Sequence, residues 1–180
     1  MMKVFLIGFM GCGKSTIGKA LAERLKFDFV DTDALIEERL GMKIEEVVAT
    51  KGEMFFRHIE TELLREITYQ KDDTESIIVA CGGGMACCNT NLLMMLYGGT
   101  TIYLQSSENV LYDRLKNEKS NRFLIKNKTD DELKTYIAAT LSQRHKSYYS
   151  QADMIISNND SVDDCIEKLL NKTLFARLFA

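Results

Sequence analysis

The 180-residue sequence contains no proline, so its turns must rely on glycine, asparagine, aspartate and serine. No apolar stretch approaches the ~20 residues that a membrane-spanning helix requires. The formal net charge of −3 creates no general basic field that would attract nucleic acid or an anionic membrane. We therefore expect neither nucleic acids nor membranes among the partners of this chain.

Histidine is also scarce, since His58 and His145 are the only two. They form no zinc-ligand pattern with the five cysteines. The cysteines have no framework spacing and follow no signal peptide, which predicts reduced thiols in a cytoplasm. Cys12 and Cys81 lie beside glycine motifs, but no histidine is placed to activate either thiol, so packing roles are expected for both.

The remaining composition is that of a single folded domain. Hydrophobic residues make up 46% of the chain and charged residues 27%, as is typical of one soluble domain spanning residues 1–180. A chain of this length buries roughly 70% of its unfolded surface in one core. We expect the protein to act as a monomer.

Short runs of β-forming residues alternate with longer segments of helical period. The predicted strands are residues 3–7, 27–30, 77–84, 100–104 and 153–157. The predicted helices are residues 17–25, 34–40, 43–52, 53–70, 89–99, 107–117 and 130–149, followed by one or two helices over residues 161–179, with Ser107 as a candidate N-cap. This alternation, with nearly continuous apolar strands, predicts an α/β fold: a five-stranded parallel sheet covered by helices on both faces.

The segment GFMGCGKST (residues 8–16) directly follows an apolar strand and matches the phosphate-loop pattern. Its glycines allow backbone N–H groups to surround a phosphate at the N-terminus of the next helix. Lys14 would reach the β- and γ-phosphates, and the Ser15 hydroxyl would bind Mg²⁺. A glycine-rich turn that contains Lys-Ser by chance is disfavoured, because every motif position and both flanking elements match. The motif predicts a nucleotide site but does not identify the phosphate acceptor.

Asp31 and Asp33 come directly after the second predicted strand. Open α/β sheets hold their ligands at this edge. One carboxylate can therefore serve a metal while the other serves an acceptor hydroxyl. The alternative is that Asp33 caps the next helix and Asp31 is simply solvated.

Other features are ambiguous on their own. Arg57 and Glu60 lie at i, i+3 on one predicted helix, which is also typical of a surface ion pair. The glycines at 82–84 permit close approach of backbone to a ligand, but they also fit a flexible turn. Residues 118–128 form a basic, aperiodic loop that either closes over transferring phosphates or is only solvated. Its basic residues are Lys119, Arg122, Lys126 and Lys128.

In order and spacing, these segments resemble the shikimate kinase family over nearly the whole chain. The segments that carry the resemblance are GFMGCGKSTIGKALA, FVDTDALIEERLG, FFRHIE, IIVACGGG, RFL and RHKSYYSQAD. The resemblance implies a P-loop kinase fold with strand order 2-3-1-4-5, a lid near residues 118–128 and a substrate-binding helical region near residues 33–60. It also implies transfer of the ATP γ-phosphate to the 3-hydroxyl of shikimate in aromatic amino acid biosynthesis, with Mg²⁺ as the cofactor.

The resemblance also implies which residues bind the nucleotide. The implied ATP site consists of Gly11, Cys12, Gly13, Lys14, Ser15, Thr16, Arg114 and Arg122. Within this set, Arg114 would stack on adenine and Arg122 would reach the phosphates from the lid. Ser15 would bind Mg²⁺, and Asp31 would hold the ion through water.

The implied shikimate site consists of Asp33, Arg57, Glu60, Gly82, Gly83 and Arg144. Arg57 and Arg144 would bind the shikimate carboxylate, a planar anion that suits the guanidinium group. Glu60 would orient Arg57 or a hydroxyl, and Asp33 would bind the acceptor hydroxyls and receive the proton. The predicted catalytic residues are therefore Lys14, Asp33 and Arg122.

The chain departs from the family pattern at identifiable places. Phe123 follows Arg122 where the family lid usually has proline, so the hinge of the lid is less constrained. After the last strand, where some members contact adenine with an arginine, this chain has Ser157 and Asn158. No role is assigned at that place.

Two alternatives remain open at this point. A kinase of another small hydroxy acid or sugar, such as gluconate, or of a nucleoside monophosphate would keep the nucleotide site and change the acceptor pocket. A non-catalytic, nucleotide-binding regulatory module would need no acceptor-side groups, whereas Asp31 and Asp33 are present beside Lys14 and Ser15. The implied acceptor set favours the kinase of shikimate, because it suits one carboxylate with neighbouring hydroxyls.

Overall fold

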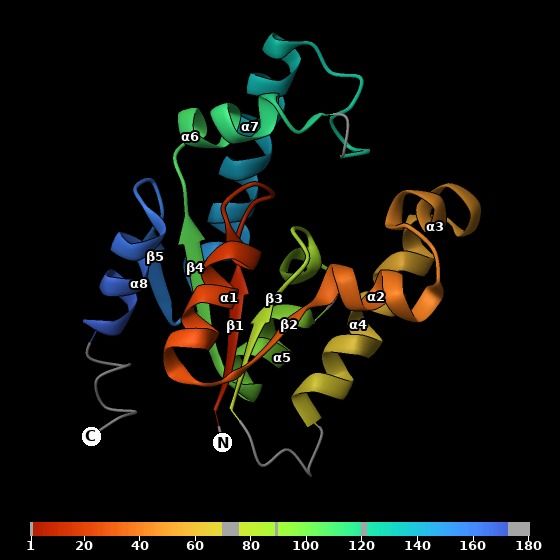
Figure 1. Cartoon of the computed structure of the whole chain (residues 1–180). Helices are drawn as coiled ribbons and strands as arrows, with labels where there is room; N and C mark the ends of the chain where they lie inside the picture. Colours follow the sequence, from red (N-terminus) through yellow and green to blue (C-terminus); the bar gives the residue numbers. More distant parts are fainter. Residues whose placement is uncertain (1, 70–75, 89, 120–121, 173–180) are drawn as a thin grey trace.

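The computed structural model describes residues 2–69, 76–88, 90–119 and 122–172 (Figure 1). Within them, five parallel strands form one sheet in the order β2-β3-β1-β4-β5. The strands are β1 (Lys3–Ile7), β2 (Asp28–Asp31), β3 (Ile77–Ala80), β4 (Thr100–Gln105) and β5 (Met154–Ser157). The predicted α/β fold and the strand order implied by the family resemblance are both confirmed.

Helices connect the strands in the predicted alternation. They are α1 (Lys14–Leu25), α2 (Thr32–Leu40), α3 (Ile44–Lys51), α4 (Glu53–Tyr69), α5 (Asn91–Gly98), α6 (Glu108–Lys116), α7 (Asp130–Ser147) and α8 (Val162–Leu170), with the short 3-10 helices η1 (Met85–Cys87) and η3 (Tyr149–Gln151). The first helix begins at Lys14 rather than Ile17, because the phosphate loop leads directly into the first helical turn. Residues 70, 89 and 173–179 of the predicted helices lie outside the described residues, and the helix predicted from residue 161 onward already ends at Leu170.

The sheet has an apolar core on each of its two faces. Val4 and Leu6 of β1 are fully buried in the core that is shared with α1, α6, α7 and α8. Phe5 and Ile7 are buried in the other core, which is shared with α2, α3, α4 and α5. Successive strand side chains point to opposite faces, so a strand covered on both sides is apolar throughout. Each such side chain contributes roughly 1.5–3 kcal/mol through burial.

In this proline-free chain, side-chain caps mark the starts of several helices, and glycine marks the end of α2. The hydroxyl of Ser107 accepts a hydrogen bond from the backbone N–H of Val110 at 3.4 Å, which confirms the predicted N-cap. Thr129 and Ser161 form capping boxes at the starts of α7 and α8. Gly41 ends α2 with a φ of 60°, in the left-handed region that favours glycine. Such N-caps typically stabilise a helix by about 1 kcal/mol each.

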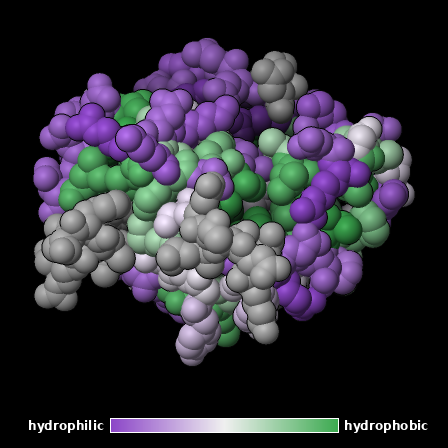
Figure 2. Space-filling model, turned by 60° about the horizontal axis from the view of Figure 1, so that its bottom comes forward, coloured by the Kyte–Doolittle hydropathy of each residue, from purple (hydrophilic) through white to green (hydrophobic). Residues whose placement is uncertain are grey.

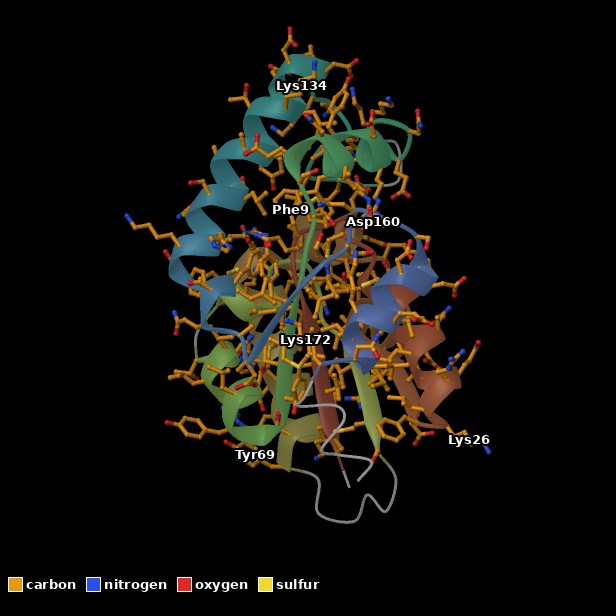
Figure 3. The ribbon with its side chains drawn as sticks, turned by 90° about the vertical axis from the view of Figure 1, so that its left-hand side faces the viewer. Phe9, Lys26, Tyr69, Lys134, Asp160 and Lys172 are labelled. Atoms are coloured by element: carbon orange, nitrogen blue, oxygen red, sulfur yellow. The ribbon has the colours of Figure 1, made fainter. Side chains whose placement is uncertain are left out.

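Because all strands run the same way, their carboxyl ends meet at one edge of the sheet, at the top of Figure 1. The loop after β1 lies at this edge, with α6 and α7 above it and α2 and α3 to one side (Figure 1). Phe9 and Asp160 are labelled at the same edge in Figure 3, whereas Lys26 and Tyr69 lie toward the opposite end. Parallel α/β sheets bind their ligands at the carboxyl edge.

The surface at the opposite end is mixed. Figure 2, which brings the bottom of Figure 1 forward, shows hydrophobic areas interrupted by hydrophilic ones. The exposed large apolar side chains include Tyr69 of α4 and Leu93 and Tyr97 of α5. In the described ranges, no helix combines the length and the apolar character needed to cross a membrane.

Candidate active site

The loop between β1 and α1 is shaped by glycines with positive φ angles: 148° at Gly8, 76° at Gly11 and 92° at Gly13. A side chain is excluded at Gly8, because a Cβ there would lie 2.7 Å from the Sγ of Cys12 and 2.8 Å from the carbonyl oxygen of Leu104. The glycine spacing of the phosphate-loop motif therefore has a steric cause in this fold.

Lys14 folds back over this loop. Its Nζ donates hydrogen bonds to the carbonyl oxygens of Gly8 and Phe9 at 2.9 and 3.1 Å. The residue is buried, at the N-terminus of α1, where the first backbone N–H groups carry partial positive charge. The ammonium group and the helix terminus together favour an anion at this point.

A cavity of about 430 Å³ opens over the loop and the start of α1; we call it the nucleotide cavity. Its volume is in the range usual for small-molecule sites. The polar and glycine residues that line it are Gly11, Gly13, Lys14, Ser15, Thr16, Asp31, Asp33, Gly83, Arg114, Glu118, Arg122, Asn158 and Asp160. All residues of the predicted ATP site except Cys12 are thus brought together.

Cys12 lies elsewhere. Its side chain is fully buried in the apolar core on the α1 side of the sheet, which confirms the predicted packing role. Its backbone carbonyl accepts a hydrogen bond from the side chain of Asn158. Contact between Cys12 and a nucleotide would therefore involve the backbone rather than the thiol.

The two predicted metal-binding residues contact each other. The hydroxyl of Ser15 donates to the Oδ2 of Asp31 at 2.5 Å. The Oδ1 of Asp31 accepts from the backbone N–H groups of Asp33 and Ala34 at 3.1 and 3.2 Å, so Asp31 is the N-cap of α2. The alternative that Asp33 caps this helix is wrong, because the strand ends at Asp31 and the helix begins at Thr32.

Asp33 lies in the first turn of α2. A Cβ at Gly82 would overlap the Oδ1 of Asp33 and lie 2.9 Å from the Oε1 of Glu60, so the glycine lets the two carboxylates approach each other. Burial raises the pKa of Asp33 and Asp31 adds to this shift, although Lys14 acts in the opposite direction. Asp33 therefore binds a proton more readily than an ordinary aspartate.

Arg57 of α4 is held by two glutamates of its own helix. Its Nη1 lies 2.7 Å from the Oε2 of Glu60, and its Nη2 lies 3.0 Å from the Oε1 of Glu53. Glu60 is 1% exposed, and burial raises the pKa of its carboxyl to about 7, against the effect of Arg57. The pair is not an ordinary surface ion pair, because one partner is buried.

The glycine turn after β3 packs between these groups. The backbone N–H of Gly82 donates to the buried hydroxyl of Thr32 at 2.8 Å. The carbonyl of Gly83 accepts from the Nη1 of Arg144 at 2.9 Å and from the hydroxyl of Tyr149 at 3.3 Å. Hydrogen bonds from α2, α7 and η3 therefore hold this turn in place.

A second cavity, also of about 430 Å³, adjoins the first; we call it the acceptor cavity. Its lining includes Lys43, Glu45, Phe56, Arg57, Glu60, Gly84, Phe123, Leu124 and Arg144. The two cavities share Met10, Asp31, Asp33, Gly83 and Arg122. All residues of the predicted shikimate site line the acceptor cavity except Gly82, which contributes its link to Thr32.

The described part of the predicted lid reaches across to α3. Arg122 pairs with Glu118 at 2.7 Å and lines both cavities. Lys126 forms an ion pair with Glu45 of α3. Ile125, between them, is fully buried in the core on the α1 side. Burial of Ile125 thus anchors the segment, while Arg122 faces the cavities and Lys126 contacts α3.

Sequence reasoning missed three residues of this arrangement. Thr32 holds the glycine turn, Tyr149 supports it from the other side, and Asn158 bonds the phosphate loop. For Thr32 and Asn158 a signal existed, because each directly follows a strand at the ligand-binding edge. Tyr149 has no comparable signal, since its place depends on how α7 ends.

The chemistry of the donor set suits magnesium. Among the described residues, no group of three or more His, Cys, Asp and Glu side chains is arranged to hold a metal. Ser15 and Asp31 nevertheless bring two hard oxygen donors together at the edge of the phosphate loop. Proteins usually hold Mg²⁺ through one or two such groups, with waters and substrate phosphates completing the shell.

The phosphate loop lies on a sheet of order 2-3-1-4-5 and adjoins a cavity lined by arginines and carboxylates. Together these features define a P-loop kinase of small molecules. A family model described as shikimate kinase matches residues 10–174 of the chain. The chain belongs to the shikimate kinase family, whose members are phosphotransferases that use ATP and act on a hydroxyl group of shikimate.

Individual relatives agree with this assignment. The shikimate kinase of Azobacteroides pseudotrichonymphae genomovar. CFP2 is 40% identical over 173 residues, which are 96% of this chain and 99% of that protein. The crystal structure of shikimate kinase from Bacteroides thetaiotaomicron is 33% identical, with a TM-score of 0.85 over 94% of this chain and 96% of that one. The structure of shikimate kinase from Acinetobacter baumannii in complex with shikimate is 29% identical, with a TM-score of 0.87 over 99% and 96% of the two chains.

Proposed function

We propose that this protein transfers the γ-phosphoryl group of ATP to the 3-hydroxyl of shikimate, which gives shikimate 3-phosphate and ADP in aromatic amino acid biosynthesis. The observation that carries the proposal is the junction of the two cavities at Asp33 and Arg122. One cavity contains the phosphate loop, and the other contains two arginines suited to a carboxylate. Membership of the family supports the same acceptor.

ATP occupies the nucleotide cavity in this proposal. Its phosphates bind the backbone N–H groups of the loop and the start of α1, and Lys14 turns from the loop carbonyls to the β- and γ-oxygens. Arg114 stacks on adenine. Ser15 would hold Mg²⁺ directly and Asp31 through water, and the ion would supply positive charge that neutralises the phosphates.

Shikimate occupies the acceptor cavity. Arg57 and Arg144 bind its carboxylate, and both guanidinium groups are already held by hydrogen bonds, to Glu60 and to the carbonyl of Gly83. Groups that are fixed before binding lose less conformational entropy when the ligand arrives. Glu60 lines the same cavity and would orient Arg57 or one of the acceptor hydroxyls.

Asp33 lies between the two substrates. It accepts a hydrogen bond from the 3-hydroxyl, aligns that oxygen with the γ-phosphorus and takes its proton as the new O–P bond forms. The raised pKa of Asp33 makes it a better proton acceptor than an ordinary aspartate. Lys14 and Arg122 offset the charge on the moving phosphoryl group, and the lid excludes water that would otherwise hydrolyse ATP.

The test is ADP release in a coupled assay with ATP, Mg²⁺ and one acceptor at a time: shikimate, gluconate or a nucleoside monophosphate. We expect ADP release that depends on shikimate and on Mg²⁺. Activity confined to gluconate or to a nucleoside monophosphate would overturn the acceptor. ATP binding without turnover of any acceptor would favour the non-catalytic regulatory module instead.

We also propose that the enzyme is a monomer of the cytoplasm with no nucleic-acid partner. All five cysteines are free thiols, as a reducing compartment requires. Light scattering of the purified protein tests the monomer, and fractionation of cells tests the compartment.

A further inference from the structure

Asn158 directly follows β5 and reaches the phosphate loop from the far end of the chain. It is 3% exposed, and its Nδ2 donates to the carbonyl oxygen of Cys12 at 2.7 Å. Its own backbone is fixed as well: its N–H donates to the carbonyl of Gln105 at 2.8 Å, and its carbonyl accepts from the hydroxyl of Ser106 at 2.9 Å. The side-chain amide that bonds the loop therefore belongs to a residue whose backbone is fixed by hydrogen bonds to the end of β4 and the residue after it.

The hydrogen bond to Cys12 determines which way one peptide group of the loop faces. In a planar trans peptide, the C=O of one residue and the N–H of the next point in opposite directions. The carbonyl of Cys12 points to Asn158. The N–H of Gly13 must therefore point away from Asn158, and Gly13 lines the nucleotide cavity.

The contact is sterically tight at Gly13, and Arg114 bonds both the loop and Asn158 beside it. Gly13 has a φ of 92°, and a Cβ there would lie 2.8 Å from the Nδ2 of Asn158. The neighbouring carbonyl of Gly11 accepts from the Nη1 of Arg114 at 3.4 Å, and the Nη2 of Arg114 bonds the carbonyl of Asn158 at 3.1 Å. The carbonyls of Gly11 and Cys12 are thus both held by the hydrogen-bonded pair Arg114 and Asn158.

We propose that Asn158 is a positioning residue for phosphate binding: its amide holds the Cys12–Gly13 peptide so that the N–H of Gly13 faces the phosphates. A flipped peptide would turn a carbonyl oxygen toward them, and two electronegative groups would then repel each other. The proposal rests on the proposed function, because it assumes that a nucleotide phosphate occupies the loop. It differs from a purely structural role in affecting nucleotide affinity and leaving shikimate affinity unchanged.

The test compares Asn158→Asp with Asn159→Asp, using ADP affinity measured by calorimetry on the full chain. The first change keeps the shape of the side chain but places an acceptor oxygen against the carbonyl of Cys12. The second is a matched control: the exposed Asn159 accepts from the backbone N–H of Ser107 through its Oδ1, which a carboxylate retains. Asn158→Ala removes the hydrogen bond without adding a charge.

We expect Asn158→Asp to weaken ADP binding by at least about tenfold and Asn158→Ala by about three- to tenfold, in line with loss of a buried hydrogen bond. Shikimate affinity, measured on the same samples, should stay within about twofold. Asn159→Asp should bind both ligands as the wild type does.

The proposal is overturned if both Asn158 variants bind ADP within about twofold of wild type. It is also overturned if they lose ADP and shikimate affinity equally, or if both variants melt below the assay temperature, because Asn158 would then be structural. The ADP measurement needs no phosphoryl transfer. A wild type that binds ADP but does not phosphorylate shikimate would refute the proposed function and leave this comparison intact.

Discussion

The two cavities are built in different ways. The nucleotide cavity opens over one contiguous run, residues 8–16, whose carbonyls accept hydrogen bonds from Lys14, Arg114 and Asn158, and residues from other elements complete its lining. The acceptor cavity is formed by residues from α2, α3, α4, α7 and the lid, and ion pairs such as Lys126–Glu45 join these elements. We call the two cavities with their lining residues the nucleotide half and the acceptor half of the site. The nucleotide half depends on the path of one segment, and the acceptor half depends on how separate elements pack.

This difference matches what each half must recognise. Phosphate groups are the same in every nucleotide, so a fixed ring of N–H donors serves them. An acceptor with a carboxylate and several hydroxyls must be distinguished from similar molecules, which requires side chains placed in three dimensions. We therefore expect changes in the nucleotide half to act on the chemistry or on ATP, and changes in the acceptor half to act on shikimate.

The largest effect is expected for Lys14→Ala in the nucleotide half. The change removes the ammonium group that would offset charge on the transferring phosphoryl, so kcat should fall by about 10³-fold. Steady-state kinetics with ATP and shikimate measures it. Lys19→Ala, on the exposed side of α1, is the control and should leave kcat unchanged. A kcat for Lys14→Ala within about tenfold of wild type would remove Lys14 from the mechanism.

Asp33→Asn tests the point where the two halves meet. The amide keeps the shape but cannot take the proton, so kcat should fall by about 10²-fold, with ADP affinity within about twofold of wild type. Asp28→Asn, at the exposed start of β2, provides the control. Turnover equal to wild type would exclude Asp33 as the proton acceptor, and a large loss of ADP affinity would assign it to the nucleotide half alone.

The fold could be predicted almost completely, because its signals are local. The apolar run at 3–7 and the cap at Ser107 each indicate an element within a few residues. Two of the errors fall where the backbone forms the ligand-binding edge. α1 begins at Lys14, where no apolar period exists, and β3 ends at Ala80 because the following glycines turn toward the site.

The site divides in the same way. The sequence predicts the phosphate loop, because its donors come from one contiguous segment. Arg57 and Glu60 look like a surface pair in the sequence, since the burial of Glu60 arises only when α4 packs near Asp33. The family resemblance implies their roles, whereas their spacing does not. No spacing rule connects Asn158 to Cys12, which lie at opposite ends of the chain.

A buried carboxyl on the acceptor side should make stability depend on pH. The pKa of Glu60 is raised from its ordinary value of 4.5 to about 7, so the folded protein holds a proton that the unfolded chain releases between these values. The bound proton therefore stabilises the folded protein. This stabilisation is complete below the pKa of Glu60 in the unfolded chain and is lost as the pH rises through its pKa in the folded protein.

We therefore expect the free energy of unfolding of the wild type to fall by about 2 kcal/mol relative to Glu60→Gln between about pH 5 and 8. Urea titrations of both proteins across this range measure the difference. The neighbours Asp33, Glu53 and Arg57 are common to both proteins, so their contributions largely cancel. Parallel pH profiles would show that Glu60 titrates like an exposed glutamate.

Arg57→Ala should affect the acceptor alone. Loss of a guanidinium–carboxylate contact should raise the KM for shikimate by about tenfold and leave the KM for ATP within about twofold. Arg65→Ala on the same helix is the control, because Arg65 is exposed and pairs only with Glu62 among the described contacts. An unchanged KM for shikimate would refute the carboxylate assignment.

The smallest effect is expected at the ion pair between Lys126 of the lid and Glu45 of α3. Both side chains are roughly half exposed, so the pair should contribute only about 0.2–1 kcal/mol. Lys126→Ala and Glu45→Ala should each raise the KM for shikimate by about twofold, and the double variant should add nothing further, because all three changes break one contact. The effect should shrink at high salt, where exposed charges are screened.

The control for this cycle is Lys134→Ala, whose partner Asp131 lies on the same helix and which lines neither cavity. If the acceptor cavity depends on contacts between separate elements, breaking the Lys126–Glu45 ion pair should change the KM for shikimate in a salt-dependent way. The KM for ATP should not change. Equal changes in both constants would mean that the lid and α3 also shape the nucleotide half. The distinction between the two cavities would then not hold at Arg122, one of the residues that line both of them.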